Sequence, residues 1–347
     1  MCGGCRGVLW RAEAIWGGAP TKLQRNVMAD NFIWLRGEIV RQSQAFVNVL
    51  SPAAQFGLNV FEGIRCYWNA EDGVLYAFRL RDHLHRLLQS SRIVSFKSPY
   101  SVAEIERSFR HAIEANDFLC DTAVRLTLFG DGEGSWSSCE PISMFIAPMP
   151  RARTDLRKIP KFAACVSSWE RINDNVLPPR AKVGANYING RFAHLQARRD
   201  GYDLPIFLGA DRKVAEGAGA CLFMVRSGEL ITPPTTSSVL DSITRDTVIR
   251  MARDIGIGVR ERTIDRTELY LADEIFLCGS AAEISPIVSV DRFEVGRGEP
   301  GPLTVDMLRR YLAVASGADG RYPDWRTAVN RTKAGSRSQN ELEARGR

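Results

Sequence analysis

Four short segments of the chain combine residue types that could carry out chemistry together. Lys182 lies among small and apolar residues in the segment 181–187 (AKVGANY), which would partly remove its amine from water. A lysine amine in such surroundings is a possible nucleophile toward a carbonyl group. Glu216 is followed by small residues in 216–219 (EGAG), so the backbone beside this carboxylate can approach a flat ligand closely. Each feature also has a plain structural alternative, a surface lysine and a tight surface turn.

The other two segments could bind anions. Residues 240–246 (LDSITRD) lie where a strand leads into a helix, so the N–H groups of Ile243 and Thr244 would face a phosphate at the helix N-terminus. Residues 278–283 (CGSAAE) offer N–H groups and the Ser280 hydroxyl at the end of a strand. The structural alternatives are an ordinary helix cap and a tight turn, so neither segment is decisive by itself.

Hydrophobic periodicity predicts the elements that must position these segments. Helices are expected at residues 80–88, 101–116, 186–199, 243–255 and 303–315. Strands are expected at residues 32–35, 37–40, 76–80, 124–129, 142–147, 162–167, 204–208, 222–225, 229–232, 259–263 and 274–277. The order lacks the regular β-α-β alternation of a Rossmann fold, so the predicted fold class is α+β in two parts.

The length of 347 residues favours two domains, since a single core rarely keeps growing past about 250–300 residues. A Pro- and Arg-rich stretch at 148–160 is the candidate boundary. The expected division is a disordered leader at 1–27, a small N-terminal α/β domain at 28–150, a linker at 151–160, a large domain at 161–326 and a disordered tail at 327–347.

Composition indicates a globular protein without a nucleic-acid or membrane partner. Hydrophobic residues make up 45% of the chain, and the net charge of +6 includes no block of Lys and Arg interleaved with aromatics. No apolar run approaches the roughly 18 residues of a membrane span. Most of the eight cysteines stand alone in apolar runs, which is typical of buried thiols in a reducing cytoplasm. Cys2 and Cys5 form a lone CxxC, so no metal site is expected.

In their residues and in their order along the chain, these and neighbouring segments resemble one family, the branched-chain aminotransferases among the fold-type IV pyridoxal-phosphate enzymes. The resemblance runs from about Phe32 to Trp325. The matching segments are 56–67 (FGLNVFEGIRCY), 81–87 (RDHLHRL), 182–187 (KVGANY), 215–219 (AEGAG), 243–246 (ITRD), 269–274 (LYLADE) and 279–283 (GSAAE). The resemblance implies a small α/β domain followed by a larger cofactor-binding domain built as a pseudo-barrel.

The resemblance also implies roles in holding pyridoxal 5′-phosphate. Lys182 would join the cofactor as a Schiff base and move the proton in catalysis, Tyr187 would hydrogen-bond the phenolic oxygen, and Glu216 would pair with the pyridinium nitrogen. Such a carboxylate keeps the ring nitrogen protonated as an electron sink. The other implied cofactor residues hold the phosphate or pack against the ring, and they are Arg86, Ile243, Thr244 and Ser280 for the phosphate and Leu240 for the ring.

Substrate binding is implied by the same family. Backbone amides of Ser280 and Ala281 would take the α-carboxylate, and Arg125 would take the distal carboxylate of glutamate, a task that suits its planar guanidinium. The implied pocket residues are Phe56, Phe61, Arg65 and Met149.

Several positions depart from the family pattern. Phe56 stands where a tyrosine is usual, Ala123 replaces an aromatic residue, and Met149 replaces a tryptophan of some bacterial members. Ser280 stands for a threonine, with hydroxyl and amide retained, and Ala220-Cys221 stands for Glu-Asn. The pocket is therefore expected to be roomier and less aromatic, while the cofactor residues are kept.

The predicted function is transamination of leucine, isoleucine and valine with 2-oxoglutarate, by a cytoplasmic homodimer at least. Alternatives from the same fold type are an aminotransferase of specialised metabolism acting on an unusual amino acid, a D-amino-acid or (R)-amine aminotransferase, and an aminodeoxychorismate lyase. A binding module without turnover is a further alternative, disfavoured by the complete set Arg86, Lys182, Tyr187 and Glu216.

Overall fold

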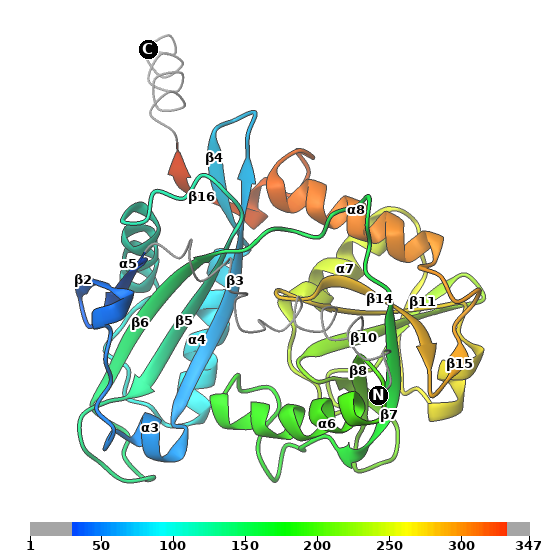
Figure 1. Cartoon of the computed structure of the whole chain (residues 1–347), viewed down its shortest axis with the longest axis horizontal. Helices are drawn as coiled ribbons and strands as arrows, with labels where there is room; N and C mark the ends of the chain where they lie inside the picture. The colour runs from blue at the N-terminus through cyan, green and yellow to red at the C-terminus, as the bar shows by residue number, and fades with distance from the viewer. Residues whose placement is uncertain (1–29, 332–347) are drawn as a thin grey trace, which may run out of the picture. The chain divides into compact units, whose positions relative to one another are not determined.

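The computed structural model describes residues 30–331 (Figure 1). The predicted leader, the Cys2/Cys5 pair and residues 332–347 of the predicted tail lie outside the described residues. Contacts divide the chain into two compact units. The first unit comprises residues 30–153, Ala181–Ala185 and residues 312–331, and the second comprises Thr154–Arg180 and Asn186–Tyr311. The mixture of helix and sheet expected from the sequence is confirmed, while the predicted domain boundaries stay a prediction.

A single antiparallel sheet forms the frame of the first unit, with the strand order β16-β4-β3-β5-β6-β1-β2. Its strands are β1 (Phe32–Leu35), β2 (Glu38–Arg41), β3 (Asn59–Asn69), β4 (Val74–Phe78), β5 (Thr122–Gly130), β6 (Ile142–Pro150) and β16 (Arg326–Arg331). Its helices are α3 (Pro52–Phe56), α4 (Leu80–Ile93) and α5 (Val102–Glu114). Ser101 and Glu104 form a capping box at the start of α5, the helix expected at residues 101–116.

The two faces of this sheet have different characters. Residues of even number in β3, such as Val60 and Ile64, are buried with Leu84 of α4 and Phe109 of α5 in one hydrophobic core. Because side chains alternate along a strand, residues of odd number lie on the opposite face. Register places Gly63 opposite Arg125, so this second face carries the predicted substrate residues of β3 and β5.

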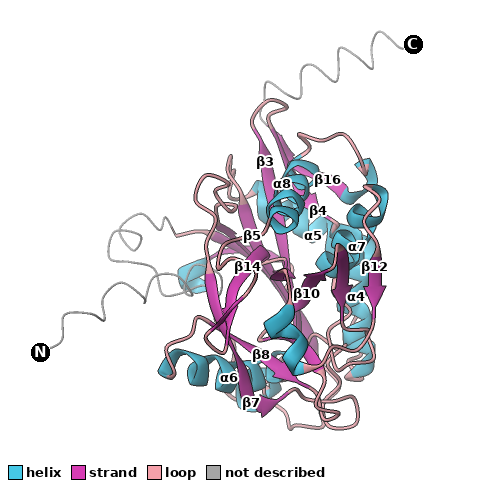
Figure 2. Cartoon of the chain, turned by 90° about the vertical axis from the view of Figure 1, so that its right-hand side faces the viewer, coloured by secondary structure: helices cyan, strands magenta, loops and turns pink. Residues whose placement is uncertain are grey.

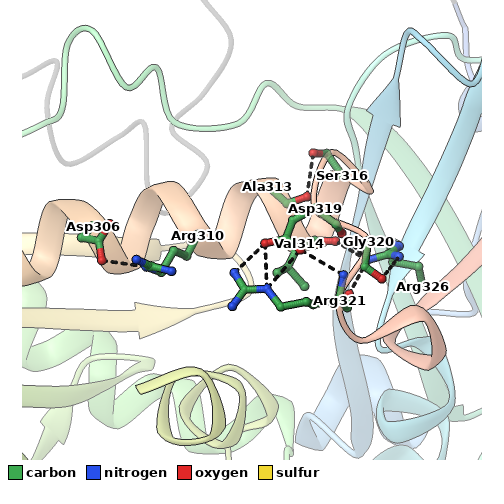
Figure 3. Close-up of polar contacts among 9 residues, drawn as sticks. All are labelled: Asp306, Arg310, Ala313, Val314, Ser316, Asp319, Gly320, Arg321 and Arg326. Atoms are coloured by element: carbon green, nitrogen blue, oxygen red, sulfur yellow. Dashed lines mark hydrogen bonds and ion pairs between the residues drawn. The ribbon is translucent and has the colours of Figure 1, made fainter. Parts of the chain in front are cut away.

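The strand β16 corrects the prediction of a disordered tail from residue 327. Residues 326–331 pair with β4, and Val329 is buried in the core of the first unit. Arg326, the first residue of this strand, donates from Nη1 to the carbonyls of Val314, Asp319 and Arg321, at 3.0, 3.0 and 2.9 Å (Figure 3). A guanidinium that bonds several carbonyls at once orders this turn, and the polar composition of the region hid the strand.

The second unit is built on a ring of strands. β10, β13, β14, β7, β8 and β9 follow one another, and β9 also pairs with β10, which closes the ring (Figure 2). Its strands are β7 (Phe162–Glu170), β8 (Leu204–Leu208), β9 (Val214–Gly217), β10 (Ala220–Arg226), β11 (Glu229–Thr232), β12 (Val259–Glu261), β13 (Glu274–Gly279), β14 (Glu283–Val290) and β15 (Phe293–Glu294). The helices are α6 (Tyr187–Arg199), α7 (Ile243–Asp254) and α8 (Pro302–Ser316), whose last turn belongs to the first unit.

Most predicted elements occur within a few residues of their expected bounds, but besides β16 four strands were not predicted, namely β3, β9, β14 and the two-residue β15. In β3, the buried charged residues Glu62 and Arg65 interrupt the alternation of apolar and polar residues from which a strand is predicted. In β14, Pro286 argues against a strand, since proline cannot donate to the ladder. The short β9 consists of Val214–Gly217, a segment that the sequence favours as a turn.

Candidate active site

Lys182 lies in an extended segment at one edge of β3. Its backbone N–H donates to Ser90 Oγ of α4 at 3.0 Å, and its carbonyl accepts from the Phe61 N–H at 3.0 Å. The neighbouring Val183 forms an antiparallel bridge with Val60. The backbone at position 182 is therefore held from both sides. The helix expected at residues 186–199 follows this segment as α6, which begins at Tyr187.

The sheet leaves room for this segment because β4 pairs with β3 only from Cys66 to Asn69. The remaining edge of β3 would otherwise leave its N–H and C=O groups unpaired. Gly184 is required where the segment passes Asn59, because a Cβ at Gly184 would lie 2.5 Å from Asn59 Oδ1. The segment KVG thus carries the Lys182 amine and, two residues later, the glycine that lets the chain pass close to Asn59 of β3.

One face of α4 carries polar side chains although it is buried. His83, Arg86 and Ser90 recur at helical spacing, and all three have less than a tenth of their surface exposed. Arg86 donates from Nε to Glu62 Oε1 and from Nη2 to Glu62 Oε2, each at 2.7 Å. His83 Nδ1 lies 2.7 Å from the same Oε2. Neither Glu62 nor His83 was predicted, because the HxxR spacing places His83 and Arg86 on one face of a helix but gives no sign of Glu62.

The charges of this cluster are settled by its geometry. Burial would raise the pKa of Glu62, but Arg86 and His83 outweigh it, so the pKa of this carboxyl lies well below its usual range. Burial lowers the pKa of His83, partly offset by Glu62, with Arg86 and Lys182 lowering it further. Glu62 is therefore ionised and His83 neutral near pH 7, with the Nδ1 proton assigned to the Glu62 bond.

The opposite face of the sheet holds the predicted substrate residues of the first unit. The Phe61 ring is close to two basic side chains, with the Arg125 guanidinium carbon 4.1 Å and Lys182 Nζ 5.0 Å from its centroid. Arg65 is buried with its guanidinium over the Tyr67 ring.

Two other predicted pocket residues belong to this unit and are more exposed. Met149 opposes Ala123 across β5 and β6, on the face of Arg125, and is 39% exposed. Phe56 ends α3 and is 43% exposed.

In the second unit, Glu216 of β9 is a buried carboxylate with its own arginine. Arg171 reaches Glu216 Oε1 from Nε at 3.0 Å and from Nη2 at 2.8 Å. The other oxygen, Oε2, accepts from the Cys221 thiol at 3.6 Å and from the Leu240 N–H at 3.4 Å. The structure thus brings the predicted Glu216 and Leu240 together, and adds Arg171 and Cys221, which sequence analysis missed.

Two thiols continue the row of Glu216 across the sheet. Cys221 lies opposite Glu216 in β9 and opposite Cys278 in β13. Burial and the nearby Glu216 raise the pKa of Cys221 to about 12. Burial likewise raises the pKa of Cys278 well above its usual value. Both thiols are therefore neutral at physiological pH, and Cys221 acts as a weak donor.

The predicted phosphate and carboxylate segments lie at element ends in the second unit. Ser242 caps α7 by accepting from the Arg245 N–H at 3.2 Å, which places Ile243 and Thr244 in the first turn, both buried. Ser280 and Ala281 follow β13, in the turn that leads into β14. Tyr187 is the first residue of α6.

Residues 30–331 contain no group of three or more His, Cys, Asp or Glu side chains that could hold a metal ion. Over the same range, no helix has both the length and the hydropathy needed to cross a bilayer. The donors that could hold a ligand are therefore an amine, guanidiniums, a buried carboxylate and the N-terminus of α7.

The comparisons with known proteins identify the class of enzyme as the aminotransferases. A family model described as amino-transferase class IV matches residues 59–290, and the chain belongs to this family.

Individual relatives are similar over nearly the whole described chain. The branched-chain-amino-acid aminotransferase of Salmonella typhimurium is 38% identical over 314 residues, covering 86% of this chain and 98% of its own. The crystal structure of branched-chain amino acid aminotransferase from Thermobaculum terrenum in its PLP form has a TM-score of 0.82 at 43% identity, covering 87% of this chain and all of that one. The branched-chain amino acid aminotransferase of T.th., complexed with N-(5′-phosphopyridoxyl)-L-glutamate, has a TM-score of 0.80 at 33% identity, covering 87% of this chain and 99% of that one.

Proposed function

We propose that this enzyme transfers the amino group of leucine, isoleucine or valine to 2-oxoglutarate, with pyridoxal 5′-phosphate as cofactor, and releases the 2-oxo acid and L-glutamate. The observation that carries the proposal is the fixed Lys182, whose backbone is bonded on one side to β3 and on the other to α4. The names of the relatives support the substrate class, and the ligands in two of the similar structures support the cofactor and glutamate.

The residues present fit this cofactor chemically. An aldehyde needs an amine, which Lys182 supplies. A phosphate needs N–H donors, and Arg86 and the N-terminus of α7 with Thr244 supply them. A pyridinium nitrogen needs an anion, and the buried Glu216 beside Arg171 is one. We assign Tyr187 to the phenolic oxygen, and the remaining proposed cofactor residues are Leu240, Ile243 and Ser280.

When bound, pyridoxal phosphate supplies a ring that stabilises negative charge at the substrate Cα. The residues of this chain move one proton and fix the positions of the charged groups around the reacting atoms. Lys182 would take the proton from the Cα of the amino donor and deliver it to C4′ of the cofactor. In the second half-reaction it would move a proton from C4′ to the Cα derived from 2-oxoglutarate. Glu216 keeps a proton on the ring nitrogen, and Arg171 pairs with Glu216 in its buried position.

We assign substrate recognition to the residues that the family resemblance implies. The amides of Ser280 and Ala281 bind the α-carboxylate, and Arg125 binds the distal carboxylate of 2-oxoglutarate. Phe61 provides apolar surface for a branched side chain, with Phe56, Arg65 and Met149 shaping the pocket. Because Ala123 and Met149 are smaller than the aromatic residues expected there, we expect activity toward donors bulkier than leucine as well.

We further propose that the enzyme is a cytoplasmic homodimer. The loop 46–50 of the first unit exposes Phe46, Val49 and Leu50 by 72%, 78% and 50%, which is typical of a surface that is covered in an assembly. A sedimentation experiment tests this, and a fully active monomer would disprove it. The cysteines of the described residues are all free, which supports a reducing compartment.

A donor panel tests the activity. The purified protein, refilled with pyridoxal phosphate, is supplied with 2-oxoglutarate and one donor at a time, and glutamate is measured. We expect turnover with leucine, isoleucine and valine. D-Alanine, an (R)-amine and aminodeoxychorismate test the sibling activities. No glutamate from any branched-chain donor would disprove the proposal, and turnover with only D-alanine or the (R)-amine would favour the alternative.

A further inference from the structure

Glu62 is a wholly buried carboxylate that no part of the proposed reaction uses directly. Its side chain is 0% exposed, on the helix-covered face of β3. Burying a charge in this way is costly unless each oxygen is paired with a donor. Here both oxygens are paired, and both partners, His83 and Arg86, come from one face of α4.

The contact with Arg86 is a fork, which fixes direction as well as distance. A guanidinium has five N–H donors in a rigid plane, and the fork uses the edge formed by Nε and Nη2. Holding one edge on a fixed carboxylate sets the plane of the whole group and the direction of its other donors. The same helix face holds the Lys182 N–H through Ser90, so the frame that orients Arg86 also holds the lysine backbone.

We propose that Glu62 and His83 are positioning residues for the phosphate of pyridoxal 5′-phosphate, which they serve by fixing the guanidinium plane of Arg86. The inference rests on the proposed function, because it takes Arg86 as a phosphate ligand. Glu62 holds Arg86 directly. His83 holds Glu62 Oε2 by a neutral N–H, and so fixes the carboxylate without adding a second positive charge beside Arg86.

Glu62 has two opposite effects on the binding of phosphate by Arg86, and we expect the orienting effect to dominate. Its negative charge partly cancels the charge that attracts phosphate, which alone would weaken binding. Its fork removes the rotational freedom of the guanidinium, which strengthens binding to a ligand of fixed geometry. If orientation dominates, removing the charge of Glu62 weakens phosphate binding; if charge cancellation dominates, it strengthens it.

The test compares two ligands that differ only in the phosphate. Dissociation constants of pyridoxal 5′-phosphate and of pyridoxal are measured for the cofactor-free full chain by absorbance titration. For Glu62→Gln we expect the constant for the phosphate ester to rise on the order of tenfold, as is usual for removing a partner that orients a ligand-binding group. The constant for pyridoxal should stay within about twofold.

His83 offers a matched pair of variants. His83→Asn keeps an N–H donor near the position of Nδ1, whereas His83→Ala removes it. We expect His83→Ala to weaken binding of the phosphate ester and His83→Asn to restore most of the loss. Glu140→Gln, at an exposed ion pair with Lys97, is the control for a carboxylate-to-amide change and should alter neither constant. Thermal unfolding of each cofactor-free variant identifies any that fails to fold.

Three results would overturn the inference. One is tighter binding of the phosphate ester by Glu62→Gln, which would make Glu62 a competitor of the phosphate. Another is an equal loss for both ligands, which would make the cluster a general support of the fold. The third is equal behaviour of His83→Ala and His83→Asn, and it applies even where Glu62→Gln does not fold. Failure of the proposed function would look different, since the unaltered chain would then bind neither ligand.

Discussion

Each unit contains a buried carboxylate paired with an arginine, but the residue of the pair that is proposed to bind the cofactor differs between the two units. In the first unit, Arg86 is the group proposed to bind the cofactor, and Glu62 holds it. In the second unit, Glu216 is the proposed ligand, and Arg171 holds it. Each carboxylate has almost no exposed surface, at 0% and 2% for the two side chains, and each meets two nitrogens of its guanidinium.

The comparison shows how a buried charge is stabilised before a ligand binds. A lone buried charge is expensive, so each unit supplies its own counter-ion and folds around a neutral pair. A third neutral donor steadies each carboxylate, the His83 imidazole for Glu62 and the Cys221 thiol for Glu216. Of these two donors only the imidazole can take up a proton near neutral pH, and this asymmetry can be tested.

The largest expected effect comes from Lys182→Ala, which removes the amine but leaves both ion pairs in place. We expect transamination to fall by a factor on the order of 10⁴ or more, since both proton transfer and the cofactor link are lost. Folding should be kept, because the backbone bonds of residue 182 do not need its side chain. Glutamate formation is the measurement, and Lys97→Ala at the exposed surface is the control. Near-normal activity would contradict the assignment of the catalytic amine.

Breaking the second pair with Arg171→Met should cost about 3–5 kcal/mol of unfolding free energy, because it leaves Glu216 buried without its cation. Urea unfolding of the cofactor-free protein measures the loss. The double variant Arg171→Met with Glu216→Gln removes the stranded charge as well, so we expect it to recover a large part of the stability. A double variant no more stable than Arg171→Met alone would mean that packing, not charge, makes the arginine necessary.

Arg86→Met should show a pH dependence that Arg171→Met lacks. Burial is the main cause that lowers the pKa of His83; Glu62 raises it, and Arg86 and Lys182 lower it further, so removing Arg86 lessens the lowering. A group whose folded pKa is lowered in this way costs stability as the pH falls below its unfolded pKa of about 6.5, and a smaller lowering costs less there. The destabilisation by Arg86→Met should therefore be smaller at pH 6 than at pH 8.

The same urea experiment at the two pH values measures this contrast. For Arg171→Met the third partner is Cys221, whose raised pKa of about 12 keeps it neutral at both pH values. An equal pH dependence in the two variants would show that the neutral donors do not distinguish the pairs.

The smallest effect is expected for Cys221→Ala. The thiol is a weak donor, 3.6 Å from Glu216 Oε2, so its loss should cost about 1 kcal/mol or less from the hydrogen bond, apart from the lost sulfur packing. Midpoints of urea unfolding measure it. A loss as large as that of Arg171→Met would mean that the thiol, rather than the arginine, is the main support of Glu216.

What could be predicted from the sequence was local. The capping box of α5 joins residues three positions apart and α7 starts at a single cap, so the helices expected at residues 101–116 and 243–255 lie close to their observed bounds. The family, the class of enzyme and the cofactor followed from the order of the segments, and the comparisons with known proteins confirm the family.

The supporting residues could not be predicted because their partners are distant. Glu62 and Arg86 are 24 positions apart, and Arg171 and Glu216 are 45 apart, so no periodicity links them. Each looks in isolation like an ordinary polar residue of a strand or loop. The edge position of Lys182 was missed for the same reason, since the strand that receives it lies more than a hundred residues earlier, at Val60.

The segment Ala181–Ala185 has a consequence for how the gene can be divided. Its contacts belong to the first unit, although the residues on either side of it belong to the second. An N-terminal fragment that stops at residue 153 would lose the cover of one edge of β3 and also the outer strand β16. Two bare sheet edges invite pairing with other copies. Such a fragment should aggregate when expressed alone, and the two halves of this gene are not interchangeable modules.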